Sequence, residues 1–312
     1  MKHRLLQNGR LLASLESALA ERYDLHPLWK ESDPKDFLAR HGSEFTAYVS
    51  SARYGADAAI ISALPNLRVI SSFGVGTDAI DLDVARARGI AVGYTPEVLN
   101  DCVADTALLL LLDVARGGSA ADRFVRRGDW LKGQFPLSTS VSGKRLGILG
   151  LGRIGRAIAK RAAGFDMEIR YHNRRPLADV SYGYAATLRE LAEWADFLVV
   201  ASAGGAESRH LVGADILAAL GPEGFLVNIA RGSVIDEQAL IKALASGGVA
   251  GAGLDVYEEE PQVPPELMKL DNVVLLPHVA SATRETRQAM ADLVLANLEA
   301  FFATGAVKAS AL

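Results

Sequence analysis

A glycine-rich turn near the middle of the chain constrains the fold more than any other feature of the sequence. Segment 150–155 reads Gly-Leu-Gly-Arg-Ile-Gly and directly follows the apolar run 146–149. A helical stretch at 156–165 and a second short apolar strand at 167–171 come next. Strand, turn, helix and strand in this order predict a dinucleotide-binding βαβ unit, whereas the glycine spacing alone would also fit an ordinary turn.

Each glycine of this turn has its own predicted task. Gly150 permits the tight turn, Gly152 lets the backbone approach a pyrophosphate, and Gly155 lets the helix pack closely on the strand. Backbone N–H groups at the start of the helix, around Arg153 and Ile154, are then predicted to hold the phosphates. We therefore expect these five residues to bind the cofactor.

The end of the second strand predicts which dinucleotide binds. An NAD enzyme needs an acidic residue there for the ribose 2′-hydroxyl, but the sequence reads His172-Asn173-Arg174-Arg175 and has no carboxylate. Asn173 can donate a hydrogen bond, and the two arginines can bind a 2′-phosphate with no acid present to repel it. NADP(H) is therefore the predicted cofactor; the alternative is that the arginines are a solvated strand end.

Composition limits the classes of function. The chain has 312 residues, which suggests two domains, and a net charge of −4 with no run of basic residues for nucleic acid. Cys102 is the only cysteine, so no disulfide framework, thiol metal cage or other metal site is expected. The first eight residues lack the apolar core of a secretory signal, and the longest aliphatic run, 107–112, is too short to span a bilayer. We expect a soluble, cytoplasmic protein.

Strand and helix patterns alternate over the whole chain, which predicts an α/β fold with parallel sheets and helices on both faces. The C-terminal stretch 283–302 is predicted to be one amphipathic helix. Helix 103–116 is more apolar than one solvent-facing side requires, so it fits either a buried core or interdomain helix, or a subunit interface. The predicted strands are 47–49, 69–71, 90–92, 146–149, 167–171, 197–200, 225–229, 251–254 and 273–276.

Polar residues come after three of these strands in succession. Arg231 comes after strand 225–229, and His278 comes after strand 273–276. Strand 251–254 is followed by Asp255 and by three glutamates that end at Glu260. Alone, such an arginine is more often a surface residue, such a histidine a satisfied structural group, and three glutamates a solvated turn. However, the carboxyl ends of neighbouring parallel strands meet at one ligand crevice. Reduction of a ketone needs a cation for the substrate, a proton donor near neutral pH, and a carboxylate behind that donor.

Three segments resemble the signatures of the D-2-hydroxyacid dehydrogenases, in the same order. They are 227–236 (Val-Asn-Ile-Ala-Arg-Gly-Ser-Val-Ile-Asp), 251–261 (Gly-Ala-Gly-Leu-Asp-Val-Tyr-Glu-Glu-Glu-Pro) and 276–281 (Leu-Pro-His-Val-Ala-Ser), and segment 72–78 extends the likeness into the first domain. Within the family, the chain is most similar to the glyoxylate/hydroxypyruvate and hydroxyphenylpyruvate reductases.

The resemblance implies a role for each site residue. Arg231 would bind the substrate carboxylate and carbonyl, His278 would be the acid/base, and Glu260 its partner. In the cofactor site, Ala230 and Asp255 are implicated, with Asp255 facing the nicotinamide carboxamide. The implied substrate contacts are the backbone amides of Val75 and Gly76, together with Ser281 and Arg53.

The resemblance also implies an organisation. Residues 1–98 and 286–312 would form a substrate-binding domain and 99–285 a dinucleotide-binding domain, both doubly wound parallel sheets, with a cleft between them. Helix 103–116 would lie in a homodimer interface. Some glyoxylate reductases place a tryptophan of the neighbouring subunit over the pocket, and Phe135 is the approximate counterpart here.

These features together predict an NADPH-dependent reductase of small 2-keto acids, with glyoxylate and hydroxypyruvate as leading substrates. A phenylpyruvate-type reductase is the alternative enzyme. A nucleotide-sensing binding protein of the same fold is the alternative from another class, because such proteins keep much of the active site.

Overall fold

The computed structural model describes residues 2–312 and divides them into two compact units. Unit 1 runs up to Leu99 and resumes at Ala282–Leu312, and unit 2 is Asn100–Ser281. The second boundary precedes helix α12 (Arg284–Thr304), whose N-cap Thr283 accepts a hydrogen bond from the Thr286 N–H. The boundary expected from the sequence, 285/286, lies within the first turn of this helix.

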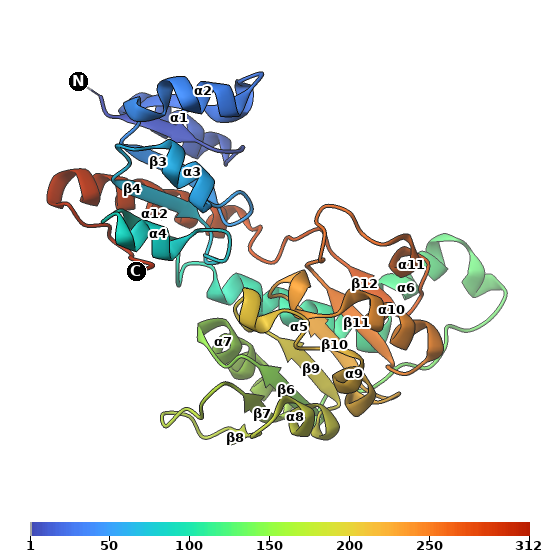
Figure 1. Cartoon of the computed structure of the whole chain (residues 1–312). Coiled ribbons are helices and arrows are strands. Elements are labelled where there is room, and N and C mark those ends of the chain that lie inside the picture. Colours follow the sequence, from blue (N-terminus) through green and yellow to red (C-terminus); the bar gives the residue numbers. More distant parts are fainter. Residues whose placement is uncertain (1) are drawn as a thin grey trace. The chain divides into compact units, whose positions relative to one another are not determined.

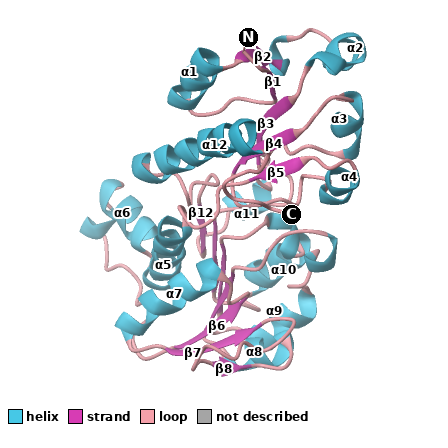
Figure 2. Ribbon diagram, turned by 90° about the vertical axis from the view of Figure 1, so that its left-hand side faces the viewer, coloured by secondary structure: helices cyan, strands magenta, loops and turns pink. Residues whose placement is uncertain are grey.

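Unit 1 is a five-stranded parallel sheet in the order β2-β1-β3-β4-β5. Helices α1 and α12 lie on one face and α2, α3 and α4 on the other (Figure 2). Because both faces are covered, β4 is buried along its whole length. The bounds are β1 (Arg4–Gln7), β2 (Asp24–Pro27), β3 (Ala47–Ser51), β4 (Val69–Phe73), β5 (Ala91–Gly93), α1 (Ala13–Arg22), α2 (Pro34–His41), α3 (Ala58–Ala63) and α4 (Leu82–Ala87).

Unit 2 is a seven-stranded parallel sheet in the order β12-β11-β10-β9-β6-β7-β8 (Figure 1). Helices α5 and α7 pack together on one face, and α8, α9 and α10 cover the other (Figure 2). The bounds are β6 (Arg145–Leu149), β7 (Glu168–His172), β8 (Gly183–Tyr184), β9 (Phe197–Val200), β10 (Phe225–Asn228), β11 (Gly251–Leu254), β12 (Val273–Leu275), α5 (Asn100–Arg116), α6 (Gly118–Arg126), α7 (Arg153–Ala162), α8 (Leu188–Trp194), α9 (Ala214–Leu220), α10 (Glu237–Ser246) and α11 (Pro265–Met268).

The α/β fold with two parallel sheets is confirmed by these two units. β6 is the first strand of unit 2. The chain then adds β7 and β8 on one side of β6, and β9 to β12 on the other. All strand pairs of this sheet are parallel. The carboxyl ends of the strands therefore lie at one edge of the sheet, and this edge carries the segments that follow β6, β7, β9, β10, β11 and β12. This edge carries most of the predicted site residues.

The apolar composition of helix α5 suggested either a core or interdomain helix or a subunit interface, and its contacts show the first of these roles within unit 2. It contacts β10 and β11, and residues such as Leu110 and Leu111 are buried, so the helix belongs to the core of unit 2. Leu109, on another side of the helix, is exposed. Across residues 2–312, no helix combines the length and apolar character needed to cross a bilayer.

Candidate active site

The glycine turn after β6 is shaped by close packing at two positions and by open space at the third. A Cβ on Gly150, where φ is 96°, would lie 2.6 Å from the Ser202 backbone nitrogen. A Cβ on Gly155 would lie 2.2 Å from the Gly150 carbonyl oxygen. A Cβ on Gly152 would meet no atom within 4 Å. The glycines at 150 and 155 are therefore required by the fold itself, and Gly152 borders the space that the sequence assigned to a pyrophosphate.

Helix α7 begins directly after this open position. Its N-cap is Gly152, and among the described residues no side chain caps it. The first turn contains Arg153, which is exposed, and Ile154, which is half-buried. A helix start of this kind directs backbone N–H groups and the positive end of the helix dipole outward. The turn and the helix together fit a dinucleotide pyrophosphate.

Asn173, directly after β7, is anchored to the glycine turn. Its Oδ1 accepts a hydrogen bond from the Leu151 N–H at 2.7 Å, and the Tyr184 hydroxyl donates to its carbonyl oxygen at 3.1 Å. Because Oδ1 is bonded within the protein, Nδ2 is the part of the amide suited to a ligand, and it is a donor. The donor role predicted for Asn173 fits this geometry.

The expectation that no acid lies near the two arginines is wrong. Arg174 Nη1 donates to Glu207 Oε2 at 2.8 Å. Glu207 lies in the short helix η5 (Ala206–Ser208), which comes after β9, so it is distant from Arg174 in sequence. The sheet order puts β9 and β7 on either side of β6, and this topology brings the two side chains together. Arg175 is exposed, like Arg174.

His278 and Glu260, which were predicted to act as the acid/base and its partner, lie in direct contact. His278 Nδ1 and Glu260 Oε2 are 2.7 Å apart, and Glu260 Oε1 accepts a hydrogen bond from the Tyr257 N–H. Burial raises the pKa of Glu260, but the hydrogen bond and charge of His278, the Tyr257 N–H and the charge of Arg231 outweigh burial and hold that pKa below its usual value. Glu260 is therefore set up as a carboxylate partner for a protonated imidazole.

Arg231 belongs to the same edge of the sheet. It directly precedes η6 (Gly232–Val234), and a Cβ on Gly232 would lie 1.8 Å from the Tyr257 carbonyl carbon, so the turn packs against the segment that leads to Glu260. Asn228, which is almost fully buried, donates to the Arg231 carbonyl oxygen at 2.9 Å and accepts from the Ala230 N–H at 3.0 Å. Asn228 was not predicted from the sequence, although an amide that ends a buried strand marks such a turn.

Comparison with known proteins assigns the family. Residues 108–280, more than half of the chain, match the model described as D-isomer specific 2-hydroxyacid dehydrogenase, NAD binding domain. The chain belongs to this family.

Named relatives of this dehydrogenase are similar over most of its length. Glyoxylate/hydroxypyruvate reductase A of Arabidopsis thaliana is 50% identical over 92% of this chain and 92% of the relative. Hydroxyphenylpyruvate reductase of Plectranthus scutellarioides is 48% identical with the same coverage of both chains. The solved NADPH-dependent glyoxylate/hydroxypyruvate reductase of Sinorhizobium meliloti, in complex with NADP and malonate, is 41% identical with a TM-score of 0.92, covering 99% of this chain and 97% of that one.

Asp255 of the dehydrogenase has a second role besides the one predicted for it. Its carboxylate is fully buried and accepts hydrogen bonds from the N–H groups of Val279 (2.7 Å) and Ala280 (2.9 Å). Burial raises its pKa, and these two bonds act in the opposite direction. The Asp255 carbonyl oxygen also accepts from the His278 N–H, where φ is 54°. Asp255 thus holds the turn that presents His278 in a left-handed conformation.

The other predicted substrate residues are spread over both units of the dehydrogenase. In unit 1, Val75 and Gly76 come after β4 and are half-buried, and the exposed Arg53 lies with its guanidinium 5.8 Å from the Tyr54 ring centroid. Ser281 is the last residue of unit 2 and is half-buried. In unit 2, the ring of Phe135 packs edge-on against Phe124 of α6, with centroids 5.5 Å apart.

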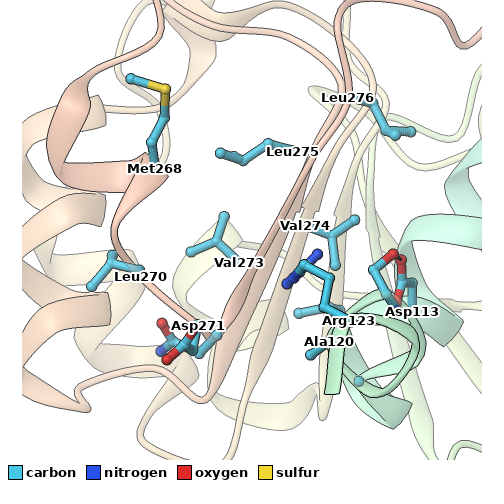
Figure 3. Close-up of a pocket in the computed structure, with 14 residues that line it drawn as sticks. Asp113, Ala120, Arg123, Met268, Leu270, Asp271, Val273, Val274, Leu275 and Leu276 are labelled. Atoms are coloured by element: carbon cyan, nitrogen blue, oxygen red, sulfur yellow. Dashed lines mark hydrogen bonds between the residues drawn. The ribbon is translucent and has the colours of Figure 1, made fainter. Parts of the chain in front are cut away.

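A cavity of about 310 Å³ lies elsewhere in unit 2. Residues of α6 and of the edge strand β12 line it, among them Arg123 and Val274 (Figure 3). None of the predicted site residues lines it.

Proposed function

We propose that this dehydrogenase is an NADPH-dependent reductase of small 2-keto acids, with glyoxylate and hydroxypyruvate as preferred substrates. One observation carries the proposal: the His278–Glu260 pair and Arg231 lie at the same sheet edge as an uncapped, glycine-started helix. The names of the relatives in Arabidopsis thaliana and Sinorhizobium meliloti support this substrate class.

In the proposed reaction, each residue acts on a defined part of the substrate. The guanidinium of Arg231 binds the carboxylate in bidentate fashion and polarises the neighbouring carbonyl. His278 donates a proton to the carbonyl oxygen, which becomes the hydroxyl. Glu260 stabilises the imidazolium before the proton leaves. The reduced nicotinamide, when bound, supplies the hydride for the carbonyl carbon, and the products are glycolate and D-glycerate.

The cofactor proposal rests on the glycine turn and the end of β7. Gly150, Gly152 and Gly155 with the start of α7 would hold the pyrophosphate. Asn173, Arg174 and Arg175 would hold the 2′-phosphate, since an amide donor and two guanidinium groups suit a phosphate dianion. Ala230 and Asp255 would contact the nicotinamide end.

For unit 1 we propose the role of substrate-binding domain. Val75 and Gly76 would bind the substrate carboxylate through their backbone amides, with Arg53 and Ser281 as further contacts. A Gly76→Ala variant is expected to raise KM for glyoxylate while the Kd of NADPH stays unchanged. Equal losses in both constants would remove Gly76 from the substrate site.

A homodimer formed through unit 2 is also part of the proposal. Large apolar side chains on α5, α6 and the segment after α6 are exposed, and Leu131 is 94% exposed. Large apolar side chains that are exposed together are typical of a protein interface. The exposed members are Leu109, Val125, Trp130, Leu131 and Leu137. Sedimentation of Leu131→Glu should show a monomer where the wild type shows a dimer; identical sedimentation would reject this surface.

A steady-state screen of 2-keto acids tests the function. Glyoxylate, hydroxypyruvate, phenylpyruvate and hydroxyphenylpyruvate are each offered with NADPH and with NADH. The proposal predicts the highest kcat/KM for glyoxylate or hydroxypyruvate with NADPH. Preference for an aromatic keto acid would favour the hydroxyphenylpyruvate activity for which the Plectranthus scutellarioides relative is named. Nucleotide binding without turnover would favour a sensing protein.

A further inference from the structure

The ion pair between Arg174 and Glu207 connects the two segments that flank the glycine turn. Arg174 comes after β7 and Glu207 after β9, and β6 lies between these strands in the sheet. Both segments touch the turn itself: Asn173 bonds to the Leu151 N–H, and Gly150 packs against Ser202. The pair therefore joins the two sides of the dinucleotide site at its adenosine end.

This arrangement places an acid in the position where the proposed cofactor needs only cations. A 2′-phosphate carries between one and two negative charges near neutral pH and accepts hydrogen bonds from the same guanidinium donors that Glu207 now occupies. Glu207 would also repel the phosphate directly, because like charges a few ångströms apart interact unfavourably. The two anions thus compete for Arg174.

The geometry points to Glu207 as a specificity-determining residue that restrains binding of the 2′-phosphate: we propose that NADPH binds only when Arg174 exchanges the Glu207 carboxylate for the phosphate. The inference rests on the proposed assignment of Arg174 to the 2′-phosphate. NADH has no phosphate to take the place of Glu207, so its binding leaves the pair intact.

The local structure favours such an exchange. The side chains of Arg174 and Glu207 are 90% and 84% exposed, so water solvates both groups while they separate. The backbone around Glu207 is fixed, since Ser208 is buried and its hydroxyl donates to the Gly205 carbonyl oxygen at 3.0 Å. The next residue, Arg209, pairs with Glu258 at 2.6 Å and does not take part. The exchange therefore needs movement of the two side chains and no change of the backbone around Glu207.

Binding of adenosine 2′,5′-bisphosphate isolates this contact, because the probe has the 2′-phosphate and lacks the nicotinamide. Its Kd is measured by calorimetry for the wild type, Glu207→Gln, Arg174→Ala and the double variant, with 5′-AMP as the matched probe without a 2′-phosphate. Glu223→Gln is the control for net charge: Glu223 is exposed and precedes β10, at the opposite edge of the sheet.

Glu207→Gln is expected to tighten binding of the bisphosphate about two- to fivefold, the range that an exposed ion pair supports. The Kd of 5′-AMP for Glu207→Gln should equal that for the wild type. The Kd of the bisphosphate for Glu223→Gln should also equal the wild-type value. In the Arg174→Ala background, Glu207→Gln should have a smaller effect, because the competition for Arg174 is gone. If Glu207→Gln bound the bisphosphate with the wild-type Kd while Arg174→Ala bound it more weakly, the role of Glu207 would be overturned and the 2′-phosphate assignment would stand. An Arg174→Ala variant that binds the bisphosphate as tightly as wild type would overturn the 2′-phosphate assignment itself.

Discussion

Two side-chain contacts, each with a glutamate, lie at the carboxyl end of the sheet of unit 2 and have nearly the same length but different surroundings. His278 and Glu260 are 2.7 Å apart, and their side chains are 47% and 25% exposed. Arg174 and Glu207 are 2.8 Å apart and 90% and 84% exposed. Water weakens the interaction within the second pair, whereas the first pair lies partly in protein, where charges interact more strongly. Distance alone therefore does not tell how firmly two charges are held.

The difference matches two different tasks. The other oxygen of Glu260 accepts a hydrogen bond from the Tyr257 N–H, and its lowered pKa keeps Glu260 ionised at a lower pH than an ordinary glutamate. Such a partner suits a histidine that must hold a proton until reaction. The Arg174–Glu207 pair suits a contact that opens when a ligand arrives. Substitutions along this edge test the division between proton transfer and cofactor choice.

Replacement of His278 is expected to have the largest effect. His278→Ala removes the proton donor and should lower kcat about 10²–10⁴-fold, the usual contribution of general acid catalysis. The Kd of NADPH should stay near wild type. His41→Ala, at a partly exposed histidine that ends α2 in unit 1, is the matched control and should leave kcat unchanged. A kcat within threefold of wild type would remove His278 from the chemical step.

Arg231→Lys comes next, because lysine keeps the charge and loses the planar fork that binds a carboxylate. Loss of charge-assisted hydrogen bonds worth about 1.5–3 kcal/mol predicts a fall in kcat/KM for glyoxylate of roughly 10- to 100-fold. Arg189→Lys on α8 serves as the control. If NADPH affinity fell in parallel with kcat/KM, Arg231 would belong to the cofactor site instead.

The Arg174→Ala/Arg175→Ala variant should lose most of the preference for NADPH over NADH. Because Arg174 is 90% exposed, screening limits the expected change to about tenfold. NADH kinetics should stay nearly constant, and the wild-type preference should weaken as salt rises. A preference that survives both arginine substitutions would mean that other residues recognise the 2′-phosphate.

The smallest change in rate is expected for Glu260→Gln, and its signature is the pH profile. In this variant a neutral amide replaces the carboxylate that contacts the proposed proton donor, so the positive charge of the donor is less well stabilised. The alkaline limb of kcat/KM should therefore move to lower pH, with kcat at the optimum within about tenfold of wild type. Glu259→Gln changes the exposed neighbour and should leave the profile in place. An unshifted limb in Glu260→Gln would point to another carboxylate.

Features that depend on residues close together in the sequence could be predicted from it. The glycine turn and its βαβ unit are predicted by spacing and hydrophobic pattern. The strands before Arg231 and His278 are apolar runs, and parallel strands bring the residues at their carboxyl ends to one edge of the sheet. On this ground the sequence predicted that Arg231, Glu260 and His278 lie at the same edge of the sheet.

Other parts depend on topology or on weak patterns. Strands β1 and β2 were not predicted, and β2 is an edge strand without a fully buried residue. Strand β8, which is two residues long, was not predicted either. The contact of Glu207 with Arg174 was not predicted, because the two residues are 33 positions apart and only the strand order brings them together. The second role of Asp255 depends on backbone N–H groups, which the pattern of side chains does not display.

The most direct test of this division of tasks is the ratio of kcat/KM for NADPH to that for NADH, measured on the wild type with glyoxylate at low and at high salt. We expect turnover with a ratio above one that falls as salt rises, because a firmly held acid/base pair does the chemistry and an exposed arginine site selects the cofactor. A ratio of one or less at low salt, or no turnover with either cofactor, would contradict it.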